Sequence, residues 1–337
     1  MKLATLLMTM FGIAVAASAA GVVYEGKDGP GKGKHIVLLS GDEEYRSEEV
    51  MTQLGRILAV RHGFKCTVLY AINPQSGEID PLTKNNIPGI EALDSADMCV
   101  MFLRFRELPG EQMKHFVDFV NSGKPIMGLR TATHAFAYGK DSKSAYAKFD
   151  WKNKEWPGGF GRQVLGETWV AHHGWHAHEA TLGVVEPSAK DHSILRGVTQ
   201  VFGPTDVYTA NPPADCTVLM RGQVLTGMNP NDPPVVGKQK PTDKYEKNNP
   251  MQPLVWLRSY TGEAGKTSKI VTTTMGCATD LQSEGFRRVL VNACYWALGL
   301  EDKIAANSNV DIVGKYQPNF GFGKFVKGMK PADLQLK

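Results

Sequence analysis

Cysteine is scarce in this sequence, and its few copies are far apart. The 337 residues include five cysteines, which are Cys66, Cys99, Cys216, Cys277 and Cys294. A small disulfide-stabilised domain instead carries an even number of cysteines at close spacings. The sequence therefore argues against such a framework, and we expect most of these side chains to be buried thiols.

A strong excess of charge of one sign is also missing. The net charge is +4 over the whole chain, and the lysines and arginines are scattered rather than clustered. Domains that bind nucleic acid carry a concentrated basic patch or stripe. The composition therefore argues against a nucleic-acid partner and favours a small neutral or mildly anionic molecule.

After the first twenty residues, the sequence contains no apolar run that approaches the length of a membrane span, which takes about 20 residues. Residues 1–20 have the pattern of a signal peptide, because Lys2 precedes an apolar stretch that ends in the cleavage motif Ala17-Ser18-Ala19. A retained anchor or an apolar first helix is the alternative, but the stretch is short for a span. We expect cleavage near Ala19 or Ala20 and a soluble periplasmic or secreted protein with no stable membrane span.

Short apolar runs alternate with helical patterns in the first half of the chain. The helical patterns, such as Val50, Leu54 and Leu58, repeat apolar residues every three or four positions. The expected strands are uniformly apolar and fall at residues 35–39, 66–69, 98–103 and 125–129. Apolar strands that alternate with helices form parallel sheets covered on both faces. The sequence therefore predicts an α/β fold with a doubly wound, mostly parallel sheet of the flavodoxin-like kind.

The second half of the chain is expected to add loops and strands to this core. Strands are predicted around residues 180–185, 217–221, 254–260 and 270–274, followed by a helix at 285–298. Residues 229–249 are rich in proline, asparagine and lysine, which is typical of a surface loop. We place one α/β domain at residues 34–301. The tail, residues 302–337, is expected to wrap the surface or to be partly disordered.

Polar loops follow three of the predicted strands. Ligands of parallel sheets bind beyond the carboxyl ends of the strands, so these loops are expected to surround one cleft. The loops are residues 41–46, 104–106 and 130–134. We assign an assisting catalytic role to Glu44. The substrate-binding candidates in these loops are Asp42, Arg46, Arg104, Arg130 and Thr131.

The segment from Pro125 to His134 resembles the strand and sharp turn that present the nucleophile in class-I glutamine amidotransferases. In that family a cysteine occupies the position held here by Arg130. A guanidinium stays protonated and cannot act as a nucleophile, so we do not expect a glutaminase. Arg130 is suited to bind a carboxylate, a phosphate or sugar oxygens. A structural salt bridge to Glu43 or Glu44 is the alternative.

Two further residue types near these loops fit chemistry on a sugar. His134 lies one helical turn beyond Arg130, where it either acts as a general acid or base or caps and packs. Tryptophans such as Trp169 stack on the apolar face of a sugar ring, and packing within a loop is their alternative fate. We count His134 as a catalytic candidate and Trp169 as a substrate-binding candidate.

Four of the nine histidines fall within seven residues, from His172 to His178. If this stretch is extended, alternation puts His176 and His178 on one face. Together with a nearby glutamate, His172, His176 and His178 are candidate ligands for a divalent metal such as zinc, manganese or iron. Because the spacing matches no closed zinc signature, a proton-transfer cluster with a catalytic His172 stays open as the alternative.

Several segments together resemble the ThuA-like (trehalose-utilisation) family of the class-I glutamine-amidotransferase-like superfamily, over residues 34–301. The segments that carry the resemblance are Leu38–Asp42, Gly128–Phe136, Leu165–His172, Thr205–Tyr208, Pro253–Trp256, Thr274–Cys277 and Asn292–Ala297. Two positions depart from the family's usual pattern, because Arg130 and Cys277 stand where histidines are expected. The resemblance implies substrate-binding positions at Tyr208 and Cys277, and a role in sugar metabolism that includes oxidised (3-keto) glycosides.

The leading hypothesis is an exported hydrolase or lyase that acts on a sugar or an oxidised (3-keto) glycoside. Arg130 would orient an anionic or keto oxygen, His134 or His172 would move a proton, and Glu44 would assist. One alternative is a non-catalytic sugar-binding protein. The other is a metal-dependent hydrolase or lyase built on the His172–His178 run. In each case the partner is a small-molecule carbohydrate.

Overall fold

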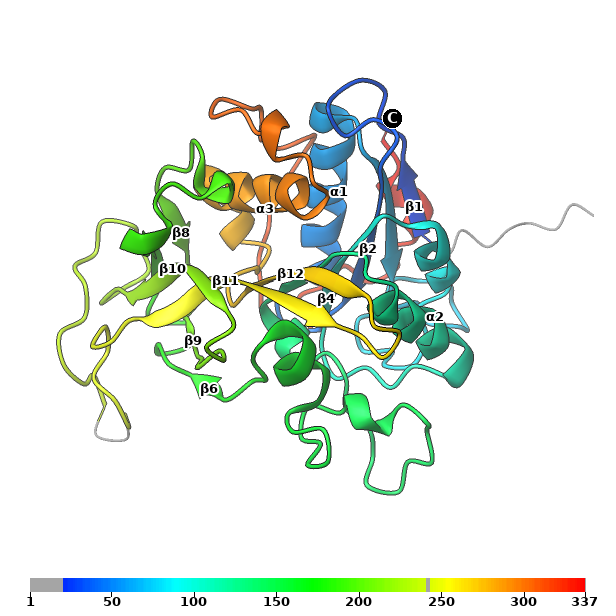
Figure 1. Cartoon of the computed structure of the whole chain (residues 1–337), viewed down its shortest axis with the longest axis horizontal. Helices are drawn as coiled ribbons and strands as arrows, with labels where there is room; N and C mark the ends of the chain where they lie inside the picture. The colour runs from blue at the N-terminus through cyan, green and yellow to red at the C-terminus, as the bar shows by residue number, and fades with distance from the viewer. Residues whose placement is uncertain (1–20, 241–242, 337) are drawn as a thin grey trace, which may run out of the picture.

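The computed structural model describes residues 21–240 and 243–336 (Figure 1). The predicted signal peptide, residues 1–20, lies outside the described residues. Within the described ranges, no helix is both long enough and apolar enough to cross a lipid bilayer. The first strand, β1 (Gly21–Tyr24), begins directly after the predicted cleavage position.

A ten-stranded sheet runs through the described part of the molecule, in the order β1-β3-β2-β4-β5-β12-β11-β10-β7-β8 (Figure 1). The other bounds are β2 (His35–Gly41), β3 (Lys65–Tyr70), β4 (Met98–Leu103), β5 (Ile126–Leu129), β7 (Thr181–Val185), β8 (Val201–Gly203), β10 (Thr217–Val224), β11 (Gln252–Thr261) and β12 (Thr267–Thr273). Neighbours from β3 to β12 pair in parallel. The pairs outside this block are antiparallel. The predicted α/β class is confirmed, and the strands predicted after residue 180 form the antiparallel extension.

Helices cover both faces of the parallel block. The helix α1 (Ser47–His62) packs with α3 (Glu284–Ala297) on one face, and α2 (Gly110–Asn121) covers the other (Figure 1). Successive residues of β2 divide between the two cores, with Ile36 in the first and Val37 in the second, and both are fully buried. A strand that is buried on both faces must be apolar at every position. This explains why the sequence shows continuous apolar runs here.

Local sequence sets the ends of the long helices. Gly63 ends α1 with a φ of 78°, and its N–H donates to the carbonyl oxygen of Ala59. Glycine takes this left-handed conformation without the Cβ clash that other residues suffer. At the start of α3, the Ser283 hydroxyl accepts a hydrogen bond from the Phe286 N–H, which satisfies one of the free donors of the first turn.

The sheet order places three loops at one edge. The strands β2, β4 and β5 are neighbours, and they run in the same direction. The loops that follow them therefore meet at the carboxyl edge of the sheet, as expected for an α/β protein. A separate two-stranded ribbon, β6 (Ala171–His172) and β9 (Tyr208–Thr209), carries part of the histidine run.

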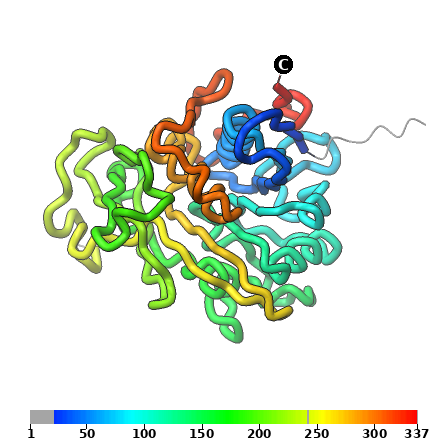
Figure 2. Tube along the Cα trace, turned by 45° about the horizontal axis from the view of Figure 1, so that its top comes forward, coloured from blue at the N-terminus to red at the C-terminus, as the bar shows by residue number. Residues whose placement is uncertain are grey.

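The tail, residues 302–336 as described, lies against the core. The Tyr316 hydroxyl donates to the carbonyl oxygen of Ala278 at 2.7 Å, and the Tyr24 hydroxyl donates to that of Leu334 at 2.7 Å. The red C-terminal end accordingly lies beside the blue β1 in Figure 2. These contacts bring the last part of the chain back to its first described strand.

We predict that His62 makes the stability depend on pH. His62 is buried on α1 beside the Tyr295 hydroxyl, and burial lowers the pKa of its imidazole to about 4. The unfolded imidazole titrates near pH 6.5. Between about pH 6.5 and 4 the unfolded chain binds more protons, so stability falls as the pH falls through this window, by up to about 1.4 kcal/mol per pH unit.

Chemical denaturation between pH 4 and 8 measures this slope. The variant His62→Gln keeps a hydrogen-bonding side chain but cannot titrate, so its slope should be shallower than that of the parent. The variant His115→Gln, on the outer surface of α2, should keep the parent slope. Equal slopes for His62→Gln and the parent would contradict the prediction.

Candidate functional site

The loops at the carboxyl edge and the β6–β9 ribbon surround a small cavity of about 40 Å³. Its walls come from the loops after β2, β4 and β5 and from the ribbon. The lining residues are Glu44, Tyr45, Arg104, Phe105, His134, Trp169, His172 and Tyr208. The structure therefore brings together six of the residues singled out in the sequence: Glu44, Arg104, His134, Trp169, His172 and Tyr208.

Arg130 lies below this cavity and does not line it. It opens the turn Arg130–His134 directly after β5 with a φ of 42°, a conformation that is uncommon for any residue but glycine. Its side chain is fully buried. The guanidinium carbon lies 4.1 Å from the ring centre of Tyr45 and 4.4 Å from that of Tyr208. Both rings are thus within the range of a favourable cation–π contact.

The partner of Arg130 is Asp206, which precedes β9. One guanidinium nitrogen donates to the Asp206 carboxylate at 3.2 Å, and the other donates to the backbone oxygens of Asp206 and Thr274 at 3.0 and 2.9 Å. We expected Arg130 to contact substrate or to pair with Glu43 or Glu44. The structure instead pairs the fully buried guanidinium with the Asp206 carboxylate and with the backbone oxygens of Asp206 and Thr274, and Arg130 does not line the small cavity.

The buried carboxylate of Asp206 accepts hydrogen bonds from three basic side chains. It accepts hydrogen bonds from Nδ1 of His172 at 2.7 Å and from Nδ1 of His176 at 2.9 Å, in addition to the bond from Arg130. Burial by itself raises the pKa of Asp206, but the two histidine hydrogen bonds and the charge of Arg130 outweigh it and lower the pKa overall. The sequence analysis did not single out Asp206, and the signal that points to it is its place two residues before Tyr208 in a segment of the family resemblance.

Only two of the three histidines predicted to bind metal are brought together. The rings of His172 and His176 lie 4.7 Å apart, whereas His178 is exposed and packs 4.2 Å from the ring of Trp175. The reason is that the strand ends at His172, and Ala177 has a φ of 60°, so the chain turns instead of alternating. Asp206 takes the place that we expected for His178.

The distances within this cluster are those of hydrogen bonds. His172, His176 and Asp206 offer ligand atoms that all lie within 4.8 Å of one another. Tetrahedral ligands at about 2.0–2.1 Å from zinc are about 3.3 Å apart, whereas the contacts to Asp206 are 2.7 and 2.9 Å. The carboxylate is also compensated by Arg130. The arrangement therefore fits a carboxylate that orients two imidazoles better than it fits a metal ligand set.

His134 forms another wall of the cavity as a neutral imidazole. It is buried, and its Nδ1 lies 3.1 Å from the Thr133 hydroxyl. Burial and the positive charges of Arg104 and Arg130 hold the pKa of His134 well below its usual range. Its ring centre lies 5.0 Å from that of Phe105. An imidazole in this state can donate or accept a hydrogen bond but does not carry charge at neutral pH.

Arg104 adds a positive charge to the lining of the small cavity. It pairs with Glu43 at 2.7 Å and with Glu44 at 3.3 Å, and its guanidinium lies 4.8 Å from the ring centre of Phe105. Its buried Nε has no hydrogen-bond partner among the described residues. A buried donor without a partner carries a desolvation cost, which a hydrogen bond to an oxygen of a ligand would offset.

Four predicted substrate-binding residues support the site from outside the cavity, as Arg130 does from below. Asp42 accepts hydrogen bonds from the Tyr45 N–H at 2.5 Å and from the Thr131 hydroxyl at 2.8 Å, which shapes the loop after β2. Arg46 pairs with Glu48 and Glu49 on α1. Cys277 is fully buried, and burial raises the pKa of its thiol. The four are Asp42, Arg46, Thr131 and Cys277.

Residues 80–297 match the family model for ThuA, which is described as trehalose utilisation. The chain therefore belongs to the ThuA family. The matched range includes the loops after β4 and β5, the histidine ribbon and Asp206. No curated protein matches the chain.

Solved structures of low sequence identity superimpose on the chain. A ThuA-like protein from Parabacteroides merdae superimposes with a TM-score of 0.51 at 14% identity, over 87% of this chain and 96% of the other. A ThuA-like protein from Bacteroides uniformis gives a TM-score of 0.46 at 15% identity, over 81% of this chain and 95% of the other. The first likeness shows the ThuA-like fold, in agreement with the family model.

The tail of this ThuA-family protein reaches the site, which the sequence analysis did not foresee. The ring of Phe320 stacks on Tyr45 at 6.3 Å and meets His176 at 6.4 Å. The Gly321 N–H donates to the carbonyl oxygen of Glu44 at 2.7 Å, and Phe322 lies under the guanidinium of Arg104 at 5.2 Å. The tail therefore braces four residues that belong to the cavity or its hydrogen-bond network.

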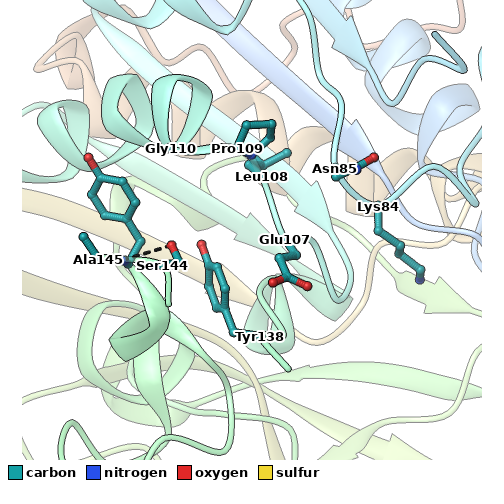
Figure 3. Close-up of a pocket in the computed structure, with 10 residues that line it drawn as sticks. Lys84, Asn85, Glu107, Leu108, Pro109, Gly110, Tyr138, Ser144 and Ala145 are labelled. Carbon is teal, nitrogen blue, oxygen red and sulfur yellow. Dashed lines mark hydrogen bonds between the residues drawn. The ribbon is translucent and has the colours of Figure 1, made fainter. Parts of the chain in front are cut away.

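A larger cavity of about 640 Å³ lies on the other side of the Lys84–Glu43 ion pair. Figure 3 shows Tyr138 and Glu107 facing it from different segments, with Lys84 at one end. It shares no lining residue with the small cavity. The perturbed and oriented titratable groups lie around the small cavity, so we place the chemistry there in spite of its size.

We predict strong coupling between Arg130 and Asp206. Replacing Arg130 by Met leaves the Asp206 carboxylate buried without its guanidinium, which should lower the free energy of unfolding by about 3–5 kcal/mol. The double variant Arg130→Met with Asp206→Asn should lose less than the sum of the two single variants. Denaturant unfolding of the four proteins measures the coupling.

The exposed pair Lys114–Asp118 on α2 is the matched control for this cycle, and its coupling should be small because solvent screens it. A coupling for Arg130 and Asp206 as small as that of the control pair would contradict the prediction.

We also predict that Phe320 stabilises the loop after β2. The variant Phe320→Ala removes an aromatic contact worth about 0.5–1.5 kcal/mol beyond its buried area, so the Tyr45 amide should exchange its hydrogen faster. Hydrogen exchange resolved by residue measures this change. The variant Val326→Ala, at an exposed tail position, should leave the Tyr45 amide as protected as in the parent.

Proposed function

We propose that this ThuA-family protein is an enzyme that acts on a sugar or an oxidised (3-keto) glycoside, with His172 as the group that moves a proton. The observation that carries the proposal is the Asp206–His172 pair at the wall of the small cavity. The sugar class is supported by the family description, trehalose utilisation. A hydrolase and a lyase are the two reaction classes that this arrangement suits.

The contact with Asp206 sets which nitrogen of His172 can react. A carboxylate that accepts from Nδ1–H holds the imidazole in one tautomer and stabilises its protonated form. Nε2 of His172 has no hydrogen-bond partner among the described residues, and the side chain is 34% exposed. His172 is therefore oriented as a general base whose reactive nitrogen is open to a ligand.

The opposite wall is suited to an oxygen that gains negative charge. Arg104 contributes a cation with an unpartnered Nε, and the neutral His134 contributes a hydrogen bond. Fixed donors and charges that face a developing oxyanion lower its free energy most in a site shielded from water. In the proposed reaction Arg104 and His134 therefore take the role that the sequence analysis gave to Arg130.

A second imidazole, that of His176, connects Asp206, the partner of His172, to Glu44 in the loop after β2. His176 donates to Asp206 through Nδ1, and its Nε2 lies 3.4 Å from Oε1 of Glu44. Glu44 itself lines the small cavity. Glu44 is thus placed to assist at the leaving group, with His176 between it and Asp206.

An oxidised glycoside would use all of these groups. The carbon next to its carbonyl carries an acidified proton, which Nε2 of His172 takes while charge develops on the carbonyl oxygen beside Arg104. The carbonyl then re-forms as a carbon–carbon double bond develops and the bond to the leaving group breaks. Protonated His172 returns its proton to the departing oxygen, with Glu44 assisting. Trp169 and Phe105 supply the aromatic walls that pack on sugar carbons.

We also propose that the protein is exported to the periplasm or secreted. The support is the sequence of residues 1–20, with its basic end, apolar stretch and small-residue cleavage motif. The first strand begins at Gly21, so cleavage there would remove no described element.

The decisive test is turnover by purified protein of residues 21–337. Trehalose, simple glucosides and their 3-keto derivatives are incubated with the parent and with the variants His172→Gln and Asp206→Asn. Each variant should lower kcat by about 100-fold or more, and the double variant should fall little further because the two residues act as a unit. The variant His115→Gln controls for the loss of a histidine elsewhere. Binding of these sugars with no turnover of any would show a sugar-binding protein instead.

A metal-dependent hydrolase or lyase is the second candidate function, because His172, His176 and Asp206 are two imidazoles and a carboxylate within reach of one ion. Elemental analysis of protein purified without chelator tests it alongside the variant His176→Gln. About one equivalent of zinc, manganese or iron that is lost in the variant, with activity lost to chelator, would favour the metal. Full activity in metal-free protein would favour the acid–base reaction.

A further inference from the structure

The small cavity is too small to hold a whole sugar. Its volume of about 40 Å³ leaves room for only a few non-hydrogen atoms. Small-molecule sites commonly measure about 300–1,000 Å³. The cavity therefore suits a reacting group, such as a carbonyl and the carbons beside it, and the body of the substrate must lie elsewhere.

A second cavity, of about 260 Å³, lies on the other side of the β6–β9 ribbon and shares His172 with the first. In the ribbon, His172 pairs with Tyr208 and Ala171 pairs with Thr209. Tyr208 lines the small cavity, whereas Ala171 and Thr209 line the second. Successive residues of a strand point to opposite faces, so the ribbon separates two spaces that meet at His172.

The second cavity contains a buried polar atom that no protein group satisfies. His173 lines it with 4% of its surface exposed, and its Nε2 has no hydrogen-bond partner among the described residues. A buried polar atom without a partner carries a desolvation cost, which a small shift of the His173 ring toward a ligand hydroxyl would relieve.

Two of the charged side chains at this cavity pair with each other, and a third, Lys244, is exposed. Nζ of Lys247 lies 3.3 Å from the carboxylate of Asp243 and donates to the backbone oxygen of His173. The Thr209 side chain adds a neutral hydroxyl. A paired lysine and carboxylate, an imidazole and a hydroxyl offer several hydrogen bonds to a ligand with several hydroxyl groups, and the exposed Lys244 ammonium can stay in solvent.

We propose that the cavity bounded by Ala171, His173 and Thr209 is a second subsite of the same active centre and holds a neutral hydroxylated ring of the substrate. The substrate thus lies across His172, with its reacting group in the small cavity and a sugar ring in the second. This assignment rests on the proposed function. It names disaccharides and related glycosides, in which the leaving group is itself a hydroxylated ring, as the substrate class.

Two substitutions at Thr209 test the subsite without touching the small cavity. The variant Thr209→Val keeps the shape and removes the hydroxyl, and Thr209→Tyr fills the space. Calorimetric titration with trehalose gives Kd, and the glycoside that the parent turns over gives KM and kcat. We expect Kd and KM to rise about threefold to tenfold for the first variant and more than tenfold for the second, with kcat of Thr209→Val within about threefold of the parent.

The larger cavity provides the matched control, because Tyr146 lines it and lies outside both subsites. The variant Tyr146→Ala should leave Kd and KM unchanged. Unchanged values in Thr209→Tyr, with a melting temperature equal to that of the parent, would overturn the subsite, as would a weakening confined to Tyr146→Ala. Parent protein that neither binds nor turns over any of the sugars would instead refute the proposed function itself, which separates the two failures.

Discussion

The buried ion pair between Arg130 and Asp206 is the interaction on which the rest of the site depends. It joins the strained turn after β5 to the start of β9, and through the backbone oxygen of Thr274 to the end of β12. Two buried charges cost several kcal/mol to desolvate, and this pair meets that cost with three hydrogen bonds and two tyrosine rings. The carboxylate that results is fixed in position and charge, and it orients both His172 and His176.

The arginine at the position that resembles the amidotransferase nucleophile takes a supporting place in the proposed site. In the turn of a class-I amidotransferase the side chain at this position reacts with substrate, whereas here it is fully buried and supports a carboxylate. The reactive groups that face the cavity come from the ribbon and from the loops after β2 and β4. The fold is kept, and function depends on the site rather than on the fold.

The site also draws on a segment that has no regular structure. Residues 316–322 of the tail pack on Tyr45, His176 and Arg104, and they hydrogen-bond to the loop after β2. These contacts support the loop after β2 with residues from the far end of the chain.

The sequence by itself determined the α/β class, the parallel core and the loops that meet at one edge, because continuous apolar runs and helical periodicity report burial directly. It also indicated that a cysteine nucleophile is missing, since Arg130 stands in a recognisable turn. Only the tertiary structure decided which side chains face the cavity. Asp206 is 76 residues from Arg130, and Phe320 is farther still from the loop it braces, so no local pattern links them. The exclusion of His178 depended on the single positive φ at Ala177, which the sequence pattern does not reveal.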